Sequence, residues 1–68
     1  MDERFEKYAR LLVEIGVNVR EGEYLLIEAP VESAPLVRLC TKIALERKAK
    51  DVIVHYTDAY VDLERLRS

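Results

Sequence analysis

The fold is decided by residues 24–56, whose sequence is YLLIEAPVESAPLVRLCTKIALERKAKDVIVHY. The continuous apolar run from Tyr24 predicts a strand covered on both faces, and Pro30 ends it because proline cannot donate to a strand ladder. Residues 33–48 carry apolar side chains at helical spacing, and residues 51–56 contain the β-branched residues typical of a second strand. This order predicts a βαβ unit, which normally belongs to a larger parallel sheet.

The helix between the two strands has recognisable ends. Ser33 is expected to cap it, and Pro35 is tolerated in the first turn because the N–H that it lacks has no partner there. The helix is expected to end near Lys48 or Ala49, where a non-glycine residue in the left-handed cap costs roughly 1 kcal/mol. Its buried stripe is predicted to contain Leu36, Val37, Cys40, Ile43 and Ala44.

A first helix is predicted from about Asp2 to Ile15. Asp2 can cap its N-terminus, where a negative charge suits the helix dipole. Gly16 fits the left-handed position after the last turn, and Gly22 supplies a later turn that needs a positive φ. The buried stripe of this helix is predicted to contain Phe5, Tyr8, Leu12 and Ile15.

A last helix is predicted over residues 59–68, and Thr57 or Asp58 can cap it. The fold class is therefore α/β: a helix, one βαβ unit with parallel strands, and a C-terminal helical segment. We expect residues 1–68 to form a single partial domain, an incomplete part of a larger α/β domain. Because a sheet of two strands is too small for independent stability, we expect the chain to need a second copy or the remainder of a longer chain.

Composition narrows the classes of function. The net charge is −2 and the basic residues are not gathered into one block, so no nucleic-acid partner is expected. No apolar run reaches the ~20 residues of a membrane span, and the N-terminus is charged rather than signal-like, so no membrane partner is expected. The single cysteine permits no internal disulfide and indicates a reducing compartment, so we expect a cytoplasmic location.

The turn between the first strand and its helix, residues 29–33, is the place where nucleotide-binding folds cradle phosphate. It contains no glycine, and the carboxylates of Glu28 and Glu32 would repel phosphate, so a capped turn is favoured. Glu28 and Glu32 could act as a pair of carboxylates in general acid–base catalysis. Because no other polar partner is near them in the sequence, a solvated turn is the favoured interpretation.

Three further candidates also have structural alternatives. His55, Asp58 and Asp62 could supply metal ligands, but a strand-end histidine hydrogen-bonded to a carboxylate neighbour is favoured. Cys40 lies on the apolar stripe without a basic activator, so it is expected to be a small buried hydrophobe rather than a nucleophile. Ser33 is better explained as a helix cap than as a nucleophile.

The carboxyl ends of the two strands are where a substrate contact would lie, since open parallel sheets bind ligands beyond those ends. Tyr56, Thr57 and Asp58 follow the second strand, and Pro30 ends the first. Packing against a neighbouring element is favoured over substrate contact. We assign no catalytic, cofactor-binding or metal residue to this chain.

The sequence resembles a known family. Residues 5–19, FEKYARLLVEIGVNV, resemble the opening of the thermophilic-type metallo-aminopeptidases, meaning aminopeptidase T, aminopeptidase S and PepS. The resemblance continues through Gly22, residues 25–38 (LLIEAPVESAPLVR) and residues 49–52 (AKDV). It covers nearly the whole chain in the expected order and corresponds to the N-terminal part of such an enzyme. The chain departs from the family at Lys48, where glycine is usual, and at Tyr56, where tryptophan is common.

The resemblance implies an N-terminal α/β domain followed by a domain with a two-metal site. The implied ligands are Glu, His, Tyr and Asp side chains downstream of this chain, and the implied metals are zinc or cobalt. Members of the family release N-terminal residues from peptides, and many are dimers. No metal or catalytic residue of the family falls on a position of this sequence.

The leading hypothesis is an N-terminal scaffold segment of a two-metal-dependent aminopeptidase, with no catalysis expected from the 68 residues alone. The alternative is a stand-alone, non-catalytic α/β module that self-associates to complete its core. A nucleotide-binding half-domain is disfavoured because the glycine-rich loop is absent.

Overall fold

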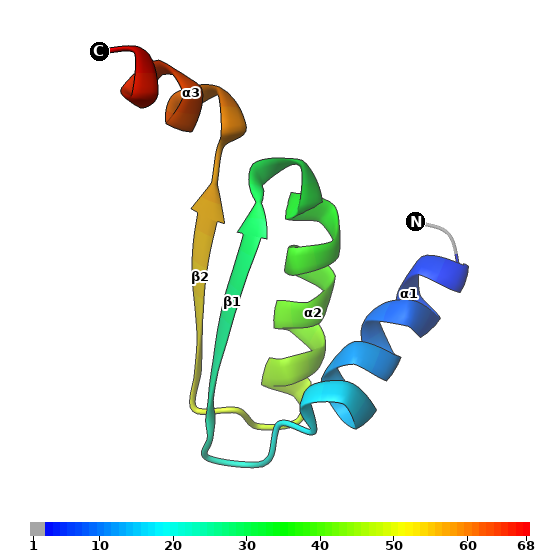
Figure 1. Ribbon diagram of the computed structural model, residues 1–68. Helices are drawn as coiled ribbons and strands as arrows, with labels where there is room; N and C mark the ends of the chain where they lie inside the picture. Colours follow the sequence, from blue (N-terminus) through cyan, green and yellow to red (C-terminus); the bar gives the residue numbers. More distant parts are fainter. Residues whose placement is uncertain (1–2) are drawn as a thin grey trace.

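The computed structural model describes residues 3–68 (Figure 1). The fold class predicted from the sequence, a helix, a parallel βαβ unit and a C-terminal helix, is confirmed. The elements are, in chain order, α1 (Glu3–Arg10), the π-helix η1 (Leu11–Val17), β1 (Tyr24–Pro30), the 3₁₀ turn η2 (Val31–Ser33), α2 (Ala34–Glu46), β2 (Asp51–Thr57) and α3 (Ala59–Arg67).

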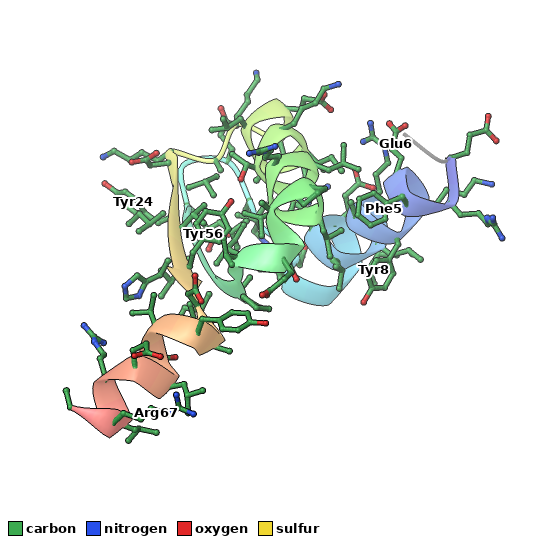
Figure 2. All side chains as sticks on the ribbon, turned by 90° about the horizontal axis from the view of Figure 1, so that it is seen from above. Phe5, Glu6, Tyr8, Tyr24, Tyr56 and Arg67 are labelled. Atoms are coloured by element: carbon green, nitrogen blue, oxygen red, sulfur yellow. The ribbon has the colours of Figure 1, made fainter. Side chains whose placement is uncertain are left out.

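The sheet is covered on one face only. β1 pairs in parallel with β2, in a register that runs from Tyr24 opposite Asp51 to Pro30 opposite Thr57. Leu25 is buried, whereas Tyr24 and Leu26 on the opposite face are each 60% exposed. Figure 2 shows Tyr24 on the side of the sheet away from α2. The prediction of a strand covered on both faces is therefore wrong for residues 3–68, because their helices supply a cover for one face only.

α2 carries the core, and its predicted stripe is confirmed. Val37, Cys40, Ile43 and Ala44 are buried, and the half-buried Leu36 packs against them. The predicted cap is wrong, because the Ser33 side chain makes no capping hydrogen bond. The turn that precedes the helix is closed instead by the backbone, where the Ala34 N–H donates to the Val31 carbonyl.

The C-terminus of α2 is a Schellman motif. Lys48 has a φ of 64°, so the predicted left-handed cap without glycine is confirmed. The Lys48 N–H donates to the Leu45 carbonyl at 3.0 Å, and the Ala49 N–H donates to the Ala44 carbonyl at 3.1 Å. Ala44 and Ala49 are both buried in the core, which is the apolar contact that accompanies this motif.

The first helix buries only part of the predicted stripe. Phe5 and Leu12 are half-buried, and Leu12 packs against the core. Tyr8 and Ile15 are exposed, and Ala9 and Val13 are buried instead; Figure 2 shows Tyr8 projecting away from α2. The short Ala9 lies in the same core as Ala44 of α2, and small side chains at a helix contact let the two axes approach.

The end of the first helix also differs from the prediction. From Leu11 the chain is π-helical, and its wider i→i+5 turns rotate later residues off a stripe that was predicted with the α-helical period. The left-handed residue is Asn18, with a φ of 54°, because the helix continues past Gly16. The predicted cap at Asp2 lies outside the described residues. Gly22 has a φ of 81°, as predicted.

α3 stands away from the rest of the molecule (Figure 1). Asp58 caps it as predicted, and its Oδ1 accepts from the N–H groups of Tyr60 at 2.9 Å and Val61 at 3.3 Å. No residue of α3 is buried. The radius of gyration is 13.9 Å, against about 11 Å for a compact domain of this length. Residues 3–68 therefore leave much of their apolar surface uncovered.

Candidate functional site

The carboxyl ends of β1 and β2 lie at one edge of the sheet, as the sequence predicted. A hollow of about 430 Å³ lies there, beside the end of β2 and the start of α3. It is lined by His55, Tyr56, Thr57, Asp58, Val61, Asp62 and Arg65. The structure therefore brings together the three predicted edge residues, Tyr56, Thr57 and Asp58, and adds Arg65, which the sequence analysis did not single out.

The carboxylate in this hollow already has a structural role. One oxygen of Asp58 accepts two backbone hydrogen bonds at the start of α3, which fixes the side chain as a helix cap. The imidazole of His55 forms no hydrogen bond with a carboxylate of residues 3–68, so the favoured strand-end pairing is not found. No three or more His, Cys, Asp or Glu side chains within residues 3–68 are grouped to hold a metal ion.

The turn between β1 and α2 offers no phosphate site of the kind found in nucleotide-binding folds. Residues 31–33 form a single 3₁₀ turn, in which Val31 and Glu32 are exposed and whose closing hydrogen bond uses the Ala34 N–H. Pro30 has no N–H to donate, and the carboxylates of Glu28 and Glu32 are exposed beside the turn. These two carboxylates form no ion pair or hydrogen bond with residues 3–68, in agreement with a solvated turn.

A second hollow, of about 300 Å³, lies between η1, β1 and α2. We call it the β1 groove. Its lining is mostly apolar and includes Leu12, Val17, Ile27, Ala29, Leu36 and Cys40, but Glu28 and Ser33 also line it. Burial raises the pKa of the Cys40 thiol, so this cysteine is a buried hydrophobe as predicted. The sequence analysis did not predict the groove. The apolar Val17, which shortly precedes the apolar β1 in the sequence, was a signal for it.

The described residues define an α/β segment built on one parallel βαβ unit. A sequence model of the thermophilic metalloprotease (M29) family matches residues 1–68. The chain belongs to that family, and its resemblance to the N-terminal segment of the family's aminopeptidases is confirmed. No helix within residues 3–68 has both the length and the apolar character needed to cross a membrane.

Individual relatives give the same result. Aminopeptidase 2 of Geobacillus stearothermophilus is 44% identical over 57 residues, which are 84% of this chain and 14% of that relative. Aminopeptidase T of Thermus aquaticus is 34% identical over 64 residues, which are 94% of this chain and 16% of that relative. The structure of wild-type AmpT from Thermus thermophilus superposes with a TM-score of 0.88 at 32% identity, over 93% of this chain and 16% of that one. The chain thus spans only a small part of the relatives that it matches.

Proposed function

We propose that this chain is the N-terminal scaffold segment of a cytoplasmic, two-metal-dependent aminopeptidase that removes N-terminal residues from peptides. The observation that carries the proposal is the match of the whole chain to the metalloprotease family. The match to a small fraction of each relative supports a scaffold role within a longer protein. The exposed apolar residues of the sheet's open face and of α3 support the same role, since a larger domain would cover them.

Residues 3–68 do not fit a two-metal site. The histidine and the aspartates at the sheet edge come closest, but Asp58 is already engaged by the start of α3. The proposal therefore assigns the zinc or cobalt pair, and all catalytic groups, to the remainder of the enzyme. The part left to residues 1–68 is to fold as a partial α/β domain and to support the rest of the chain.

The test is a chimera in which this chain replaces the matching segment of aminopeptidase 2 from Geobacillus stearothermophilus. The chimera is expected to cleave an aminoacyl anilide in the presence of zinc or cobalt, and the 68-residue chain alone is expected to cleave none. A chimera that folds and binds metal but cleaves nothing would contradict the proposal. Metal-dependent cleavage by the pure 68-residue chain would contradict the scaffold role.

The alternative is a stand-alone module that self-associates to complete its core. The open face of the sheet favours it, because Tyr24, Leu26 and Ile53 would be covered in a pair of copies. Light scattering on the 68-residue chain decides between the two forms. A well-folded monomer would exclude the self-associating module, whereas a tight dimer with the stability of a normal domain would favour it.

A further inference from the structure

We propose that the hollow beside the end of β2 and the start of α3 binds the C-terminal carboxylate of a short peptide substrate, and that Arg65 holds this carboxylate. We call it the edge hollow; it is lined by residues 55–58 and by Val61, Asp62 and Arg65. The inference rests on the proposed function, because it takes the peptide from that reaction. It adds the class of substrate, short peptides with a free C-terminal carboxylate, and the residue that selects them.

The first argument is the position of the edge hollow in the sheet. Pro30 and Thr57 lie opposite each other at the ends of β1 and β2, so both strands end at the same edge. Figure 1 shows α3 beyond that edge, where the chain leaves β2. Ligands of open parallel sheets bind outside the carboxyl ends of the strands. A ligand at this edge therefore contacts the end of β2 and the first turns of α3.

The second argument is the part of a peptide that can reach this edge. An aminopeptidase releases the residue at the N-terminus, and the proposed function places the metals and the catalytic groups outside this chain. The N-terminal end of the peptide is therefore held elsewhere in the enzyme. The edge hollow is left for the other end, which carries a carboxylate. An extended tripeptide spans at most about 11 Å, so only a short peptide places that carboxylate near the bond that is cut.

The third argument is the free guanidinium of Arg65, which lines the edge hollow. The side chain of Arg65 forms no hydrogen bond or ion pair with residues 3–68. Arg67, two residues later on α3, is paired instead with Glu64 at 3.8 Å. A guanidinium presents its N–H donors in a plane that matches the two oxygens of a carboxylate, and such paired bonds are short and strong. Arg65 thus gives the edge hollow an anion-binding group that no carboxylate of residues 3–68 occupies.

The acidic side chains of the edge hollow define the ligand further. One oxygen of Asp58 accepts two N–H groups at the start of α3, where the helix dipole offsets its negative charge. Asp62 and Arg65 both line the hollow but form no ion pair with each other. The last residue of a peptide carries an amide N–H next to its carboxylate, so it can donate to Asp62 while Arg65 binds the carboxylate. A simple anion has no such donor and is repelled by Asp62.

The size of the edge hollow agrees with this ligand. Its volume is about 430 Å³, nearly three times the ~150 Å³ of a cavity that holds benzene. It therefore has room for the C-terminal residue of a peptide together with its side chain. Tyr56 and Val61, which are 42% and 50% exposed, offer that side chain an apolar contact.

The first readout compares two substrates of the chimera with aminopeptidase 2. One is a tripeptide with a free C-terminal carboxylate, and the other is the same tripeptide with a C-terminal amide. The amide differs from the acid in lacking the negative charge that Arg65 binds. The value of kcat/KM is expected to be higher for the acid by about tenfold or more. The difference is expected in KM, because the carboxylate lies away from the bond that is cut.

A matched pair of variants provides the second readout. Arg65→Gln removes the guanidinium from the edge hollow, and Arg67→Gln removes one from the same helix outside the hollow. Both arginines are exposed, so both variants are expected to fold like the parent chimera. Arg65→Gln is expected to bring the acid-to-amide ratio of kcat/KM to about one by raising KM for the acid, and Arg67→Gln is expected to leave the ratio unchanged. A purely structural role of Arg65 would lower the cleavage of acid and amide alike and leave the ratio unchanged.

The outcomes separate this inference from the proposed function. An active chimera that cleaves acid and amide equally well, or in which the two variants behave alike, overturns the carboxylate site but leaves the scaffold role. A folded, inactive chimera overturns the aminopeptidase role, and titration calorimetry with the two peptides then tests the site by itself. Tighter binding of the acid that is abolished by Arg65→Gln retains the site, whereas equal binding or none overturns it. If the chimera does not fold, the same titration of the 68-residue chain decides in the same way.

Discussion

Replacement of Lys48 by glycine is expected to stabilise the protein. Lys48 holds the left-handed cap of α2 with a φ of 64°, a conformation that L-residues with a Cβ adopt at a cost. Its side chain is exposed and forms no hydrogen bond or ion pair with residues 3–68. The backbone contacts of Lys48 do not depend on the side chain, since its N–H donates to Leu45 and its carbonyl accepts from Gly22 at 2.9 Å.

The magnitude follows from two opposing effects. Left-handed backbone costs a non-glycine residue about 1–2 kcal/mol, which glycine avoids. Glycine also makes the unfolded chain more flexible, which reduces this stabilisation by about 0.4–1 kcal/mol. The net gain in the free energy of unfolding is therefore about 0.5–1 kcal/mol, or a rise in melting temperature of roughly 2–8 °C for a chain of this size.

The measurement is thermal and urea unfolding followed by circular dichroism. It is made on the 68-residue chain if its spectrum shows that it folds alone or as a pair of copies, and otherwise on the chimera with aminopeptidase 2. Lys42→Gly is the matched control, because Lys42 is exposed in the interior of α2, where glycine is expected to cost about 1 kcal/mol. Lys48→Gly should raise the midpoint and Lys42→Gly should lower it. If Lys48→Gly lowers the midpoint as much as the control does, the assignment of backbone strain to Lys48 is refuted.

The remaining predictions concern the core, the link between the end of α2 and the loop after η1, and the buried thiol. Ile43→Ala removes a side chain that is 1% exposed and is expected to cost about 2–5 kcal/mol, whereas Leu45→Ala on the exposed side of α2 is expected to cost much less by the same urea titration. Arg47→Met removes the bond in which Nε donates to the carbonyl of the buried Val19 at 2.9 Å, and a loss of about 1–3 kcal/mol is expected in urea because that carbonyl is left without a partner. Burial raises the pKa of the Cys40 thiol, so its contribution to stability is present below the ordinary thiol pKa and is lost as pH rises through the higher folded value. The urea midpoint is therefore expected to fall more between pH 7 and pH 10 in the parent than in Cys40→Ala, and equal falls would contradict this.

The local signals were strong where one residue type leaves the backbone few choices. Pro30 closed β1, Gly22 took a positive φ, and Asp58 capped α3, all as the sequence predicted. The stripe of α2 was also predictable, because a helix packed on a sheet buries one face with an α-helical period. The cap at Ser33 failed, because the backbone closes that turn without the hydroxyl.

At the candidate site, too, some residues were predicted from the sequence and others were not. The sequence placed Tyr56, Thr57 and Asp58 at the sheet edge because a strand's direction fixes where its end lies. It did not place Arg65 in the same hollow, because that depends on the angle at which α3 leaves β2. The β1 groove was missed for a similar reason, since its walls come from three elements whose relative positions no local pattern encodes.

By itself, the sequence determined the order of the helices and strands and the α2 stripe, because periodicity and turn chemistry act over a few neighbouring residues. The resemblance of the sequence to the metallo-aminopeptidases was also enough to identify the family. Only the tertiary structure decided which face of the first helix is buried, since the contact between α1 and α2 selects Ala9 over the larger Tyr8. Only the tertiary structure decided which sheet surfaces stay uncovered, because a strand's apolar pattern states that it will be covered but not which chain segment covers it.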